Sequence, residues 1–275
     1  MALAGCHYTA HAGEVTTATS PTVPLSPTAR STVRRGAARA RTDRAELYAV
    51  LDAGLVCHLG IVLGDAPVVL PTVYGRIGDT LYVHGSTGAA TLRAADDAPV
   101  CVTVTHVDGV VYARSAFHHT MNYRSAVVHG RARRVTDDAE RRAALRAVTE
   151  HVAPGSWDHA RPPTRKELVA TAVLALDLAE ASVKVRTGPP VDDDADVAAG
   201  GRWAGVVPIR TVVDAPQPCT LLPPGTPIPC HVLARCPACR HDPAREAVPI
   251  GRGDEAGASR STGSSRQSPP ASSPR

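Results

Sequence analysis

The sequence has few aromatic residues, few lysines and no long uninterrupted apolar run. Only 3% of its 275 residues are Phe, Trp or Tyr, and Lys166 and Lys184 are its lysines. No apolar run reaches the ~18 residues that a membrane-spanning helix needs, and no export segment is recognisable near the N-terminus. We therefore expect a cytoplasmic protein that does not insert into a membrane.

Charge is unevenly distributed along the chain. The formal net charge is +4, yet residues 43–196 carry 16 Lys and Arg against 20 Asp and Glu. The positive excess therefore belongs to the two ends of the sequence. Because nucleic-acid binding needs clustered positive charge on a folded surface, this distribution argues against a nucleic-acid partner.

Composition divides the chain into three parts. Residues 1–42 are rich in Ala, Thr, Pro and Arg, and residues 191–275 form an acidic linker followed by a tail rich in Pro, Ser and Arg. Such segments bury too little apolar surface to offset chain entropy, so we predict that both tails are largely disordered. Without an export signal, the cysteines of the C-terminal tail are expected to be free thiols. The folded domain is expected to span residues 43–190.

Short apolar segments separated by turn residues dominate this domain. Strands are predicted at Leu55–Leu63, Val68–Arg76, Thr80–His84, Pro99–Val107, Val110–Phe117, Tyr123–Val135 and Val173–Arg186. Asp108-Gly109 is the strongest of the hairpin-turn signals. Helices are predicted at Asp43–Ala53 and after capping boxes at Asp137/Glu140 and Thr164/Glu167. We predict a mainly β fold with peripheral helices, an antiparallel meander that forms a six-stranded barrel rather than a sandwich, because closure removes exposed sheet edges.

The turn between the third and fourth strands has the strongest potential for chemistry. The run His84-Gly85-Ser86-Thr87-Gly88 leads into a short helix predicted at Ala89–Ala95. Backbone N–H groups at a helix start, hydroxyl side chains and a nearby arginine can together bind an anion such as a phosphate. The same residues also suit a simple helix cap. Both interpretations stay open at this point.

Three segments, taken in order, resemble the FMN-binding split-barrel superfamily, which includes pyridoxamine 5'-phosphate oxidase. They run from Leu81 to Gly88, from Pro99 to Val104 and from Met121 to Ala132, the last with the pattern Asn-Tyr-x-Ser-x-x-x-x-Gly-x-Ala. Within the superfamily the sequence is most similar to the nitroimidazole-resistance (Nim-type) flavoproteins. The resemblance covers residues 43–190. It implies a homodimeric split barrel with one FMN in each of two clefts between the subunits. No metal site is expected, because the acidic run Asp192–Asp196 has no second cluster of ligands beside it.

The resemblance also assigns roles to individual residues. It places Val69, Leu70, Pro71 and Thr72 along the isoalloxazine ring, Val83, His84, Gly85, Ser86, Thr87 and Gly88 near the ring and the ribityl phosphate, and Arg124 and Ser125 at the flavin from a later strand. His84 matches the candidate catalytic residue of Nim-type proteins, and a neutral imidazole there can relay a proton. Relatives carry a basic residue just after the turn. This sequence has Ala89-Ala90 there, and Arg93 is the nearest replacement as a phosphate ligand.

Together these features predict an FMN-dependent oxidoreductase. Electrons would pass from a nicotinamide or another reductant, through the flavin, to a small planar acceptor such as a nitroaromatic compound. One alternative is a reductase that uses the deazaflavin F420 in the same cleft. Another is a non-catalytic module that binds flavin or haem. The substrate-phosphate signature of pyridoxamine phosphate oxidase is missing from the C-terminal part, which argues against that substrate.

Overall fold

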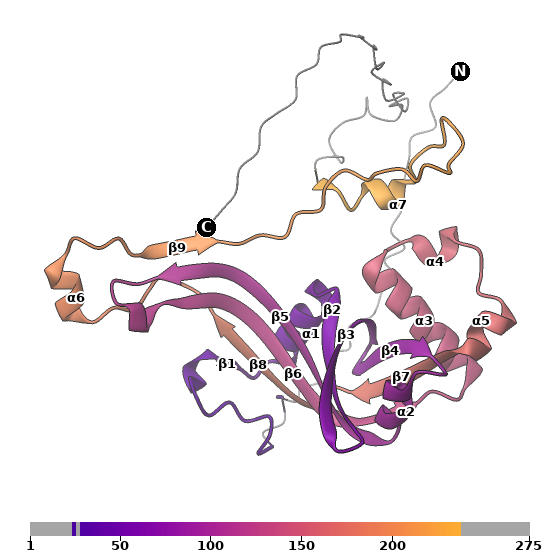
Figure 1. Cartoon of the computed structure of the whole chain (residues 1–275), viewed down its shortest axis with the longest axis horizontal. Coiled ribbons are helices and arrows are strands. Elements are labelled where there is room, and N and C mark those ends of the chain that lie inside the picture. The colour runs from indigo at the N-terminus through magenta and orange to yellow at the C-terminus, as the bar shows by residue number, and fades with distance from the viewer. Residues whose placement is uncertain (1–23, 26–27, 238–275) are drawn as a thin grey trace, which may run out of the picture.

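The structure is a computed structural model that describes residues 24–25 and 28–237 (Figure 1). Its strands are β1 (Ala40–Arg41), β2 (Val56–Leu63), β3 (Ala66–Ile77), β4 (Thr80–Ser86), β5 (Ala98–Tyr112), β6 (Thr120–Arg134), β7 (Thr171–Asp177), β8 (Glu180–Arg186) and β9 (Gly205–Pro208). Its helices are η1 (Ala37–Arg39), α1 (Arg44–Ala53), α2 (Ala90–Ala95), η2 (Ala116–His118), α3 (Asp138–Val152), α4 (Ser156–His159), α5 (Arg165–Ala170), α6 (Asp194–Ala199) and α7 (Cys230–Leu233).

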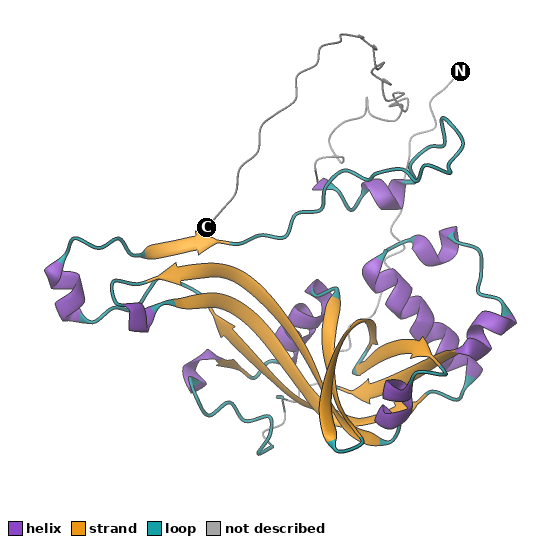
Figure 2. Ribbon diagram, viewed as in Figure 1, coloured by secondary structure: helices purple, strands orange, loops and turns teal. Residues whose placement is uncertain are grey.

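Six of the described strands form a closed ring. The ring runs β6-β7-β4-β3-β2-β5 and closes because β5 also pairs with β6. Strands β8 and β1 extend from β6, while β9 extends from the other edge of β5. Helix α1 lies among the strands and packs Leu47 and Leu51 into the core, whereas α3, α4 and α5 lie outside the ring (Figure 2). The predicted mainly β, six-stranded antiparallel fold is therefore confirmed.

Apolar side chains pack on both faces of part of the ring. Val102 and Val104 point inward from β5 and are 1% exposed, as their alternation with polar residues predicts. On the outer face, Tyr82 of β4 packs with Ala144 and Val148 of α3 in a second apolar cluster. Helix α3 begins at the predicted cap, because the Asp137 side chain accepts a hydrogen bond from the Glu140 N–H. This outer layer positions the site described below.

The prediction of a hairpin turn at Asp108-Gly109 is wrong. Strand β5 continues through both residues, and the register shifts between Val107 and Gly109 to form a β-bulge. The freed Asp108 carboxylate accepts hydrogen bonds from Arg124 at 2.8 and 2.9 Å. A Cβ at Gly109 would lie 3.0 Å from the Val207 carbonyl of β9. Only glycine leaves room here, because β9 approaches the bulge closely. The resulting Asp-Gly sequence has the composition of a hairpin turn.

The prediction of a single strand over Val173–Arg186 is also wrong, because this segment forms two strands. Strand β7 pairs with β4 and β6, whereas β8 pairs with β6 and β1. At the break, the Leu178 N–H donates to the Asp79 carbonyl, and the Ala179 N–H donates to the Asp177 carboxylate. These bonds turn the chain from one part of the sheet to another, and nothing in the apolar pattern marks that change.

Parts of the segments predicted as tails have secondary structure. Residues 28–42 contain η1 and β1, and residues 191–237 contain α6, β9 and α7 (Figure 1). Cys230 is disulfide-bonded, so the expectation of a free thiol is wrong for this residue. Residues 1–23 and 238–275, on which the rest of the tail prediction depends, lie outside the described residues. No helix within the described ranges is long and apolar enough to span a membrane.

Candidate functional site

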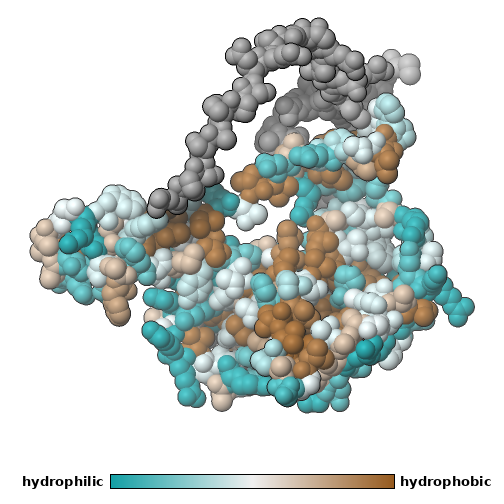
Figure 3. All heavy atoms as spheres, in the orientation of Figure 1, coloured by the Kyte–Doolittle hydropathy of each residue, from teal (hydrophilic) through white to brown (hydrophobic). Residues whose placement is uncertain are grey.

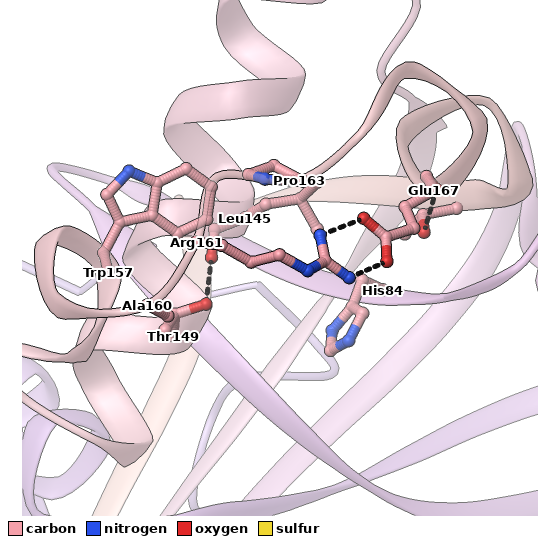
Figure 4. A pocket seen from close by; sticks show the side chains of 9 residues that line it. His84, Leu145, Thr149, Trp157, Ala160, Arg161, Pro163 and Glu167 are labelled. Atoms are coloured by element: carbon pink, nitrogen blue, oxygen red, sulfur yellow. Dashed lines mark hydrogen bonds and ion pairs between the residues drawn. The ribbon is translucent and has the colours of Figure 1, made fainter.

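A cavity of about 440 Å³ lies where the helical segment after β6 covers the outer face of β4. It is lined by His84 of β4, Leu145 and Thr149 of α3, Trp157 of α4, Ala160, Arg161 and Pro163 of the following loop, Glu167 of α5 and Thr171 of β7. Figure 4 shows Arg161 between Trp157 and Glu167, with the His84 imidazole close to the carboxylate end of that pair. Apolar walls with a few convergent polar groups are typical of small-molecule and cofactor sites.

His84 contributes an unpaired polar atom to this cavity. Side chains alternate along a strand, so the neighbouring Val83 points into the core while His84 points outward to the cavity. The His84 Nδ1 atom is buried, and no described residue forms a hydrogen bond with it. Burial lowers the pKa of His84, which favours the neutral imidazole. A neutral imidazole with an unshared ring nitrogen can accept a proton or bind a metal ion.

The cavity mouth carries a fixed pair of opposite charges. The Arg161 guanidinium donates to both carboxylate oxygens of Glu167, at 2.9 and 2.5 Å. Glu167 also accepts a hydrogen bond from the Thr164 N–H at 2.8 Å, which completes the predicted capping box of α5. The Arg161 hydrogen bonds and then those from Thr164 lower the pKa of Glu167 to about 2. Arg161 is thus held at the mouth by a carboxylate that is ionised at neutral pH.

The corner between α3 and α4 holds Trp157 in place. The Glu150 carboxylate accepts hydrogen bonds from the backbone N–H groups of Gly155 at 2.7 Å and Trp157 at 2.9 Å. Gly155 has a φ of 82°, a left-handed conformation that glycine adopts readily. Sequence reasoning missed Trp157, Arg161 and Glu150. A tryptophan just after a Pro-Gly corner, in a chain with 2 tryptophans, is the signal that could have pointed to this wall.

The turn predicted to bind a phosphate already uses its own backbone N–H groups. The Thr87 N–H donates to a carbonyl of α5 at 3.0 Å, while those of Gly88 and Ala89 donate to Ser86 atoms at 3.1 and 3.0 Å. Arg93 donates to the Gly88 carbonyl at 2.7 Å. These hydrogen bonds close the turn itself, whereas α2 begins after Ala89, whose side chain caps no N–H group of the helix. The amides of Thr87, Gly88 and Ala89 are therefore not free for a phosphate.

The β3 residues predicted at the flavin ring divide between the two faces of the strand. Val69 is 63% exposed and Pro71 is also exposed, while Leu70 and Thr72 alternate with them and are partly buried. Val83 is in the core, so its side chain is not available to a ligand outside the ring. Val69 and Pro71 therefore offer an open apolar surface rather than a wall of the cavity.

The predicted residues of β6 have partners within the chain. Arg124 is engaged by Asp108 at the bulge, as described above. The Ser125 hydroxyl donates to the Lys184 carbonyl at 3.4 Å, and Ser125 lies on the strand next to β8. Of all the predicted site residues, His84 is the one that lines the cavity. The others lie on the outer sheet face, in the core or at the turn before α2 and in α2 itself, and their assignment to a flavin stays a prediction.

We expect the free energy of unfolding to decrease as the pH falls below about 6.5, partly because of His84. The folded-state pKa of His84 is lowered from its ordinary value of 6.5, so the unfolded chain takes up this proton first. The contribution of neutral His84 to the free energy of unfolding is complete above pH 6.5. It is lost as the pH falls from 6.5 through the folded-state pKa. Urea unfolding of wild type and His84→Gln across this range is the test. Identical pH dependences of the two proteins would contradict it.

Comparison with known proteins gives a family and several similar structures. The family model for pyridoxamine 5'-phosphate oxidase matches residues 43–185. The flavocytochrome Anf3 from Azotobacter vinelandii is 41% identical over 77% of this chain and 99% of that chain, with a TM-score of 0.73. The FAD and heme binding protein from Mycobacterium smegmatis is 42% identical over 72% of this chain and 97% of that chain, with a TM-score of 0.69. A search of curated proteins finds no match.

A weaker likeness links the chain to a structure assigned to 5-nitroimidazole antibiotic resistance in Bacteroides thetaiotaomicron. The identity is 20% over 53% of this chain and 86% of that chain, and the TM-score is 0.43. The family match covers more than half of the chain and begins at the residue where the resemblance begins, Asp43. The six-stranded ring is the fold that the resemblance implies. This chain belongs to the pyridoxamine 5'-phosphate oxidase-like family of flavin-binding split-barrel proteins.

Proposed function

We propose that the protein is a flavin-dependent oxidoreductase that also holds a haem in the cavity at His84. The observation that carries the haem assignment is the buried, unshared Nδ1 atom of His84 at the wall of a cavity of about 440 Å³. One relative with more than 40% identity is named as a flavocytochrome and the other as an FAD and heme binding protein. Both names combine the two kinds of redox group.

The cavity residues fit a planar apolar group that carries a metal and acidic substituents. Leu145, Trp157 and Pro163 supply apolar surface, and the imidazole of His84 supplies a nitrogen ligand. Arg161 supplies a guanidinium at the mouth, where a carboxylate of the group can share it with Glu167. A site without such a group would leave a buried polar nitrogen unpaired, which is uncommon in folded proteins.

When bound, a flavin supplies hydride and electron transfer and a haem supplies one-electron transfer. The chain supplies the surroundings that such chemistry needs. The lowered pKa of His84 keeps its imidazole unprotonated, so a ring nitrogen can act as a ligand near neutral pH. Trp157 and Leu145 supply apolar surface to the cavity, and the Glu150 hydrogen bonds fix the backbone at the tryptophan.

We further propose that the flavin binds on the outer sheet face, between two copies of the chain. Strands β2, β3 and β5 expose valines on that side, with Val56 45%, Val62 60%, Val69 63% and Val107 40% exposed. Hydrophobic surface also gathers near the middle of the molecule in the space-filling view (Figure 3). An apolar face of this kind is typical of a contact between subunits. The resemblance favours FMN and one relative is named for FAD, so the mass of the flavin released on denaturation identifies it.

The visible spectrum of the purified protein tests the proposal. We expect flavin absorption that NADH or NADPH bleaches, together with a Soret band. Flavin absorption without a Soret band, both before and after addition of haemin, would contradict the proposed haem. The cavity would then be a site for a small planar acceptor. A colourless protein whose melting temperature FMN, FAD and haemin all leave unchanged would contradict both parts.

A further inference from the structure

A cluster of positive charge lies at the edge of the sheet where β1 meets β8. It consists of Arg39 at the end of η1 and of Lys184 and Arg186 on β8. Ala40, the residue after Arg39, pairs with Lys184. A Cβ built on Gly36 would lie 3.7 Å from the Lys184 Nζ and 3.8 Å from the Arg39 Cδ. The side chains of Arg39 and Lys184 therefore both lie beside Gly36, where the Lys184 Nζ donates to the Arg35 carbonyl at 3.0 Å.

Arg186 is buried without a carboxylate partner among the described residues. It donates to the Asn122 side-chain carbonyl, to the Gly188 carbonyl at 3.4 Å and to the Pro189 carbonyl at 3.1 Å, all of which are neutral. Burial lowers the pKa of the Arg186 guanidinium, and the positive charge of Arg39 lowers it further. Removing a guanidinium from water without an opposite charge is costly. An anion beside it would offset that cost.

This cluster adjoins a residue that the family resemblance places at the flavin. Lys184 is the cross-strand partner of Ser125, and side chains two residues apart on a strand share a face, so Arg186 follows Lys184 on that face. Of the other candidate cations, Arg124 is paired with Asp108, while Arg93 stands alone and donates to the Gly88 carbonyl. The cluster is thus a group of cations beside Ser125 that lacks a carboxylate partner within the described chain.

We propose that Arg39, Lys184 and Arg186 bind a phosphate of the flavin nucleotide. This inference rests on the proposed function, because that function makes a flavin the ligand. Planar guanidinium groups present several N–H donors to phosphate oxygens, and a lysine adds a compact positive charge. The cluster replaces the basic residue that this chain lacks at Ala89-Ala90. It is also far in sequence from the turn at which the resemblance places the phosphate.

The register of the sheet separates the cluster from β3 within one copy of the chain, so a flavin that reaches both has to lie between two copies. Pro71, His58, Thr103, Val127 and Ser182 lie side by side across β3, β2, β5, β6 and β8. At about 4.8 Å per strand, the two ends of this row are roughly 19 Å apart along the sheet. When two copies pair through this face about a twofold axis, β3 of one copy lies toward β8 of the other. The ring is then bound by one copy and the phosphate by its partner.

Flavin binding by single-charge variants tests the inference. Lys184→Gln and Arg39→Gln remove cations that are partly or fully exposed, so the fold should be retained. Isothermal titration of the flavin-free protein with FAD, FMN and riboflavin separates phosphate binding from ring binding. Each variant should weaken the binding of FAD or FMN roughly tenfold or more, because a charge-assisted contact is lost. The affinity for riboflavin, which has no phosphate, should stay unchanged.

Arg93→Gln is the matched control, because Arg93 is exposed and lies at the turn where the resemblance places the phosphate. Its affinity for FAD and FMN should equal that of the wild type. Weaker nucleotide binding by Arg93→Gln, with unchanged binding by both cluster variants, overturns the inference and returns the phosphate to the turn. Wild-type protein that binds none of the three flavins overturns the proposed flavin function itself.

Discussion

Replacing His84 with leucine is expected to remove the Soret absorption of the purified protein and to leave its flavin absorption in place. The leucine fills part of the cavity but has no nitrogen that can bind iron. Loss of groups that merely orient a metal ligand costs about 10- to 100-fold in metal affinity, so loss of the ligand itself should cost more than about a hundredfold. The measurement is the ratio of haem to flavin absorbance after purification with haemin supplied.

Two controls separate loss of a ligand from loss of the fold. His118→Leu removes a histidine of η2 that lies outside the cavity and outside the row of residues proposed to hold the flavin, so it should keep the Soret band. His84→Gly should recover the band when imidazole is added, because the small solute can occupy the space that the side chain leaves. A Soret band in His84→Leu as strong as in the wild type would show that His84 is not the haem ligand.

The strands could be predicted from the sequence wherever one face of the sheet is buried. The alternation of Val102 and Val104 with Cys101 and Thr103 predicts a half-buried strand, and the structure buries the two valines. The pattern fails at Asp108-Gly109, because a bulge approached by another strand has the composition of a tight turn. Local composition therefore identifies strands but does not distinguish a turn from a bulge that β9 covers.

The cavity could be predicted only in part, because its walls come from segments distant in sequence. His84 is found through the family resemblance, whose strand and turn residues are contiguous. Trp157 and Arg161 lie more than 70 residues later, in a segment that reaches β4 only because α3 packs across the outer face of the sheet. The capping box at Thr164 and Glu167 predicts where α5 begins. It carries no information about where α5 lies relative to β4.

The distribution of positive charge shows a similar limit. Counting charges assigns the basic residues before residue 43 to a tail, yet Arg39 lies beside β8 because β1 pairs with that strand. The basic residue missing at Ala89-Ala90 has its nearest replacement in the sequence at Arg93. Lys184 and Arg186 are far away in the sequence, on β8, which pairs with β6. A substitute charge can come from any element that folding brings to the ligand.

Replacing Gly75 with alanine is expected to destabilise the protein by about 2 to 3 kcal/mol and to lower its haem content. A Cβ on Gly75 would lie 2.5 Å from the Ala147 carbonyl carbon and from the Val148 nitrogen of α3, so the new methyl group meets backbone that cannot rotate away. Overpacking of this kind typically costs about 1 to 3 kcal/mol. The matched control is Gly60→Ala on β2, where the nearest atom, the Cys101 carbonyl oxygen, is at an ordinary 3.4 Å.

The loss of haem follows from the position of α3 rather than from any contact of Gly75 with the cavity. Helix α3 supplies Leu145 and Thr149 to the cavity wall, so a shift that relieves the clash also moves that wall away from His84. Chemical denaturation should therefore show lower stability for Gly75→Ala, and the spectrum should show a reduced Soret band at unchanged flavin absorption. Equal stability of Gly75→Ala and Gly60→Ala would mean that α3 does not press against β3. Lower stability with full haem content would mean that the haem does not depend on the wall that α3 provides.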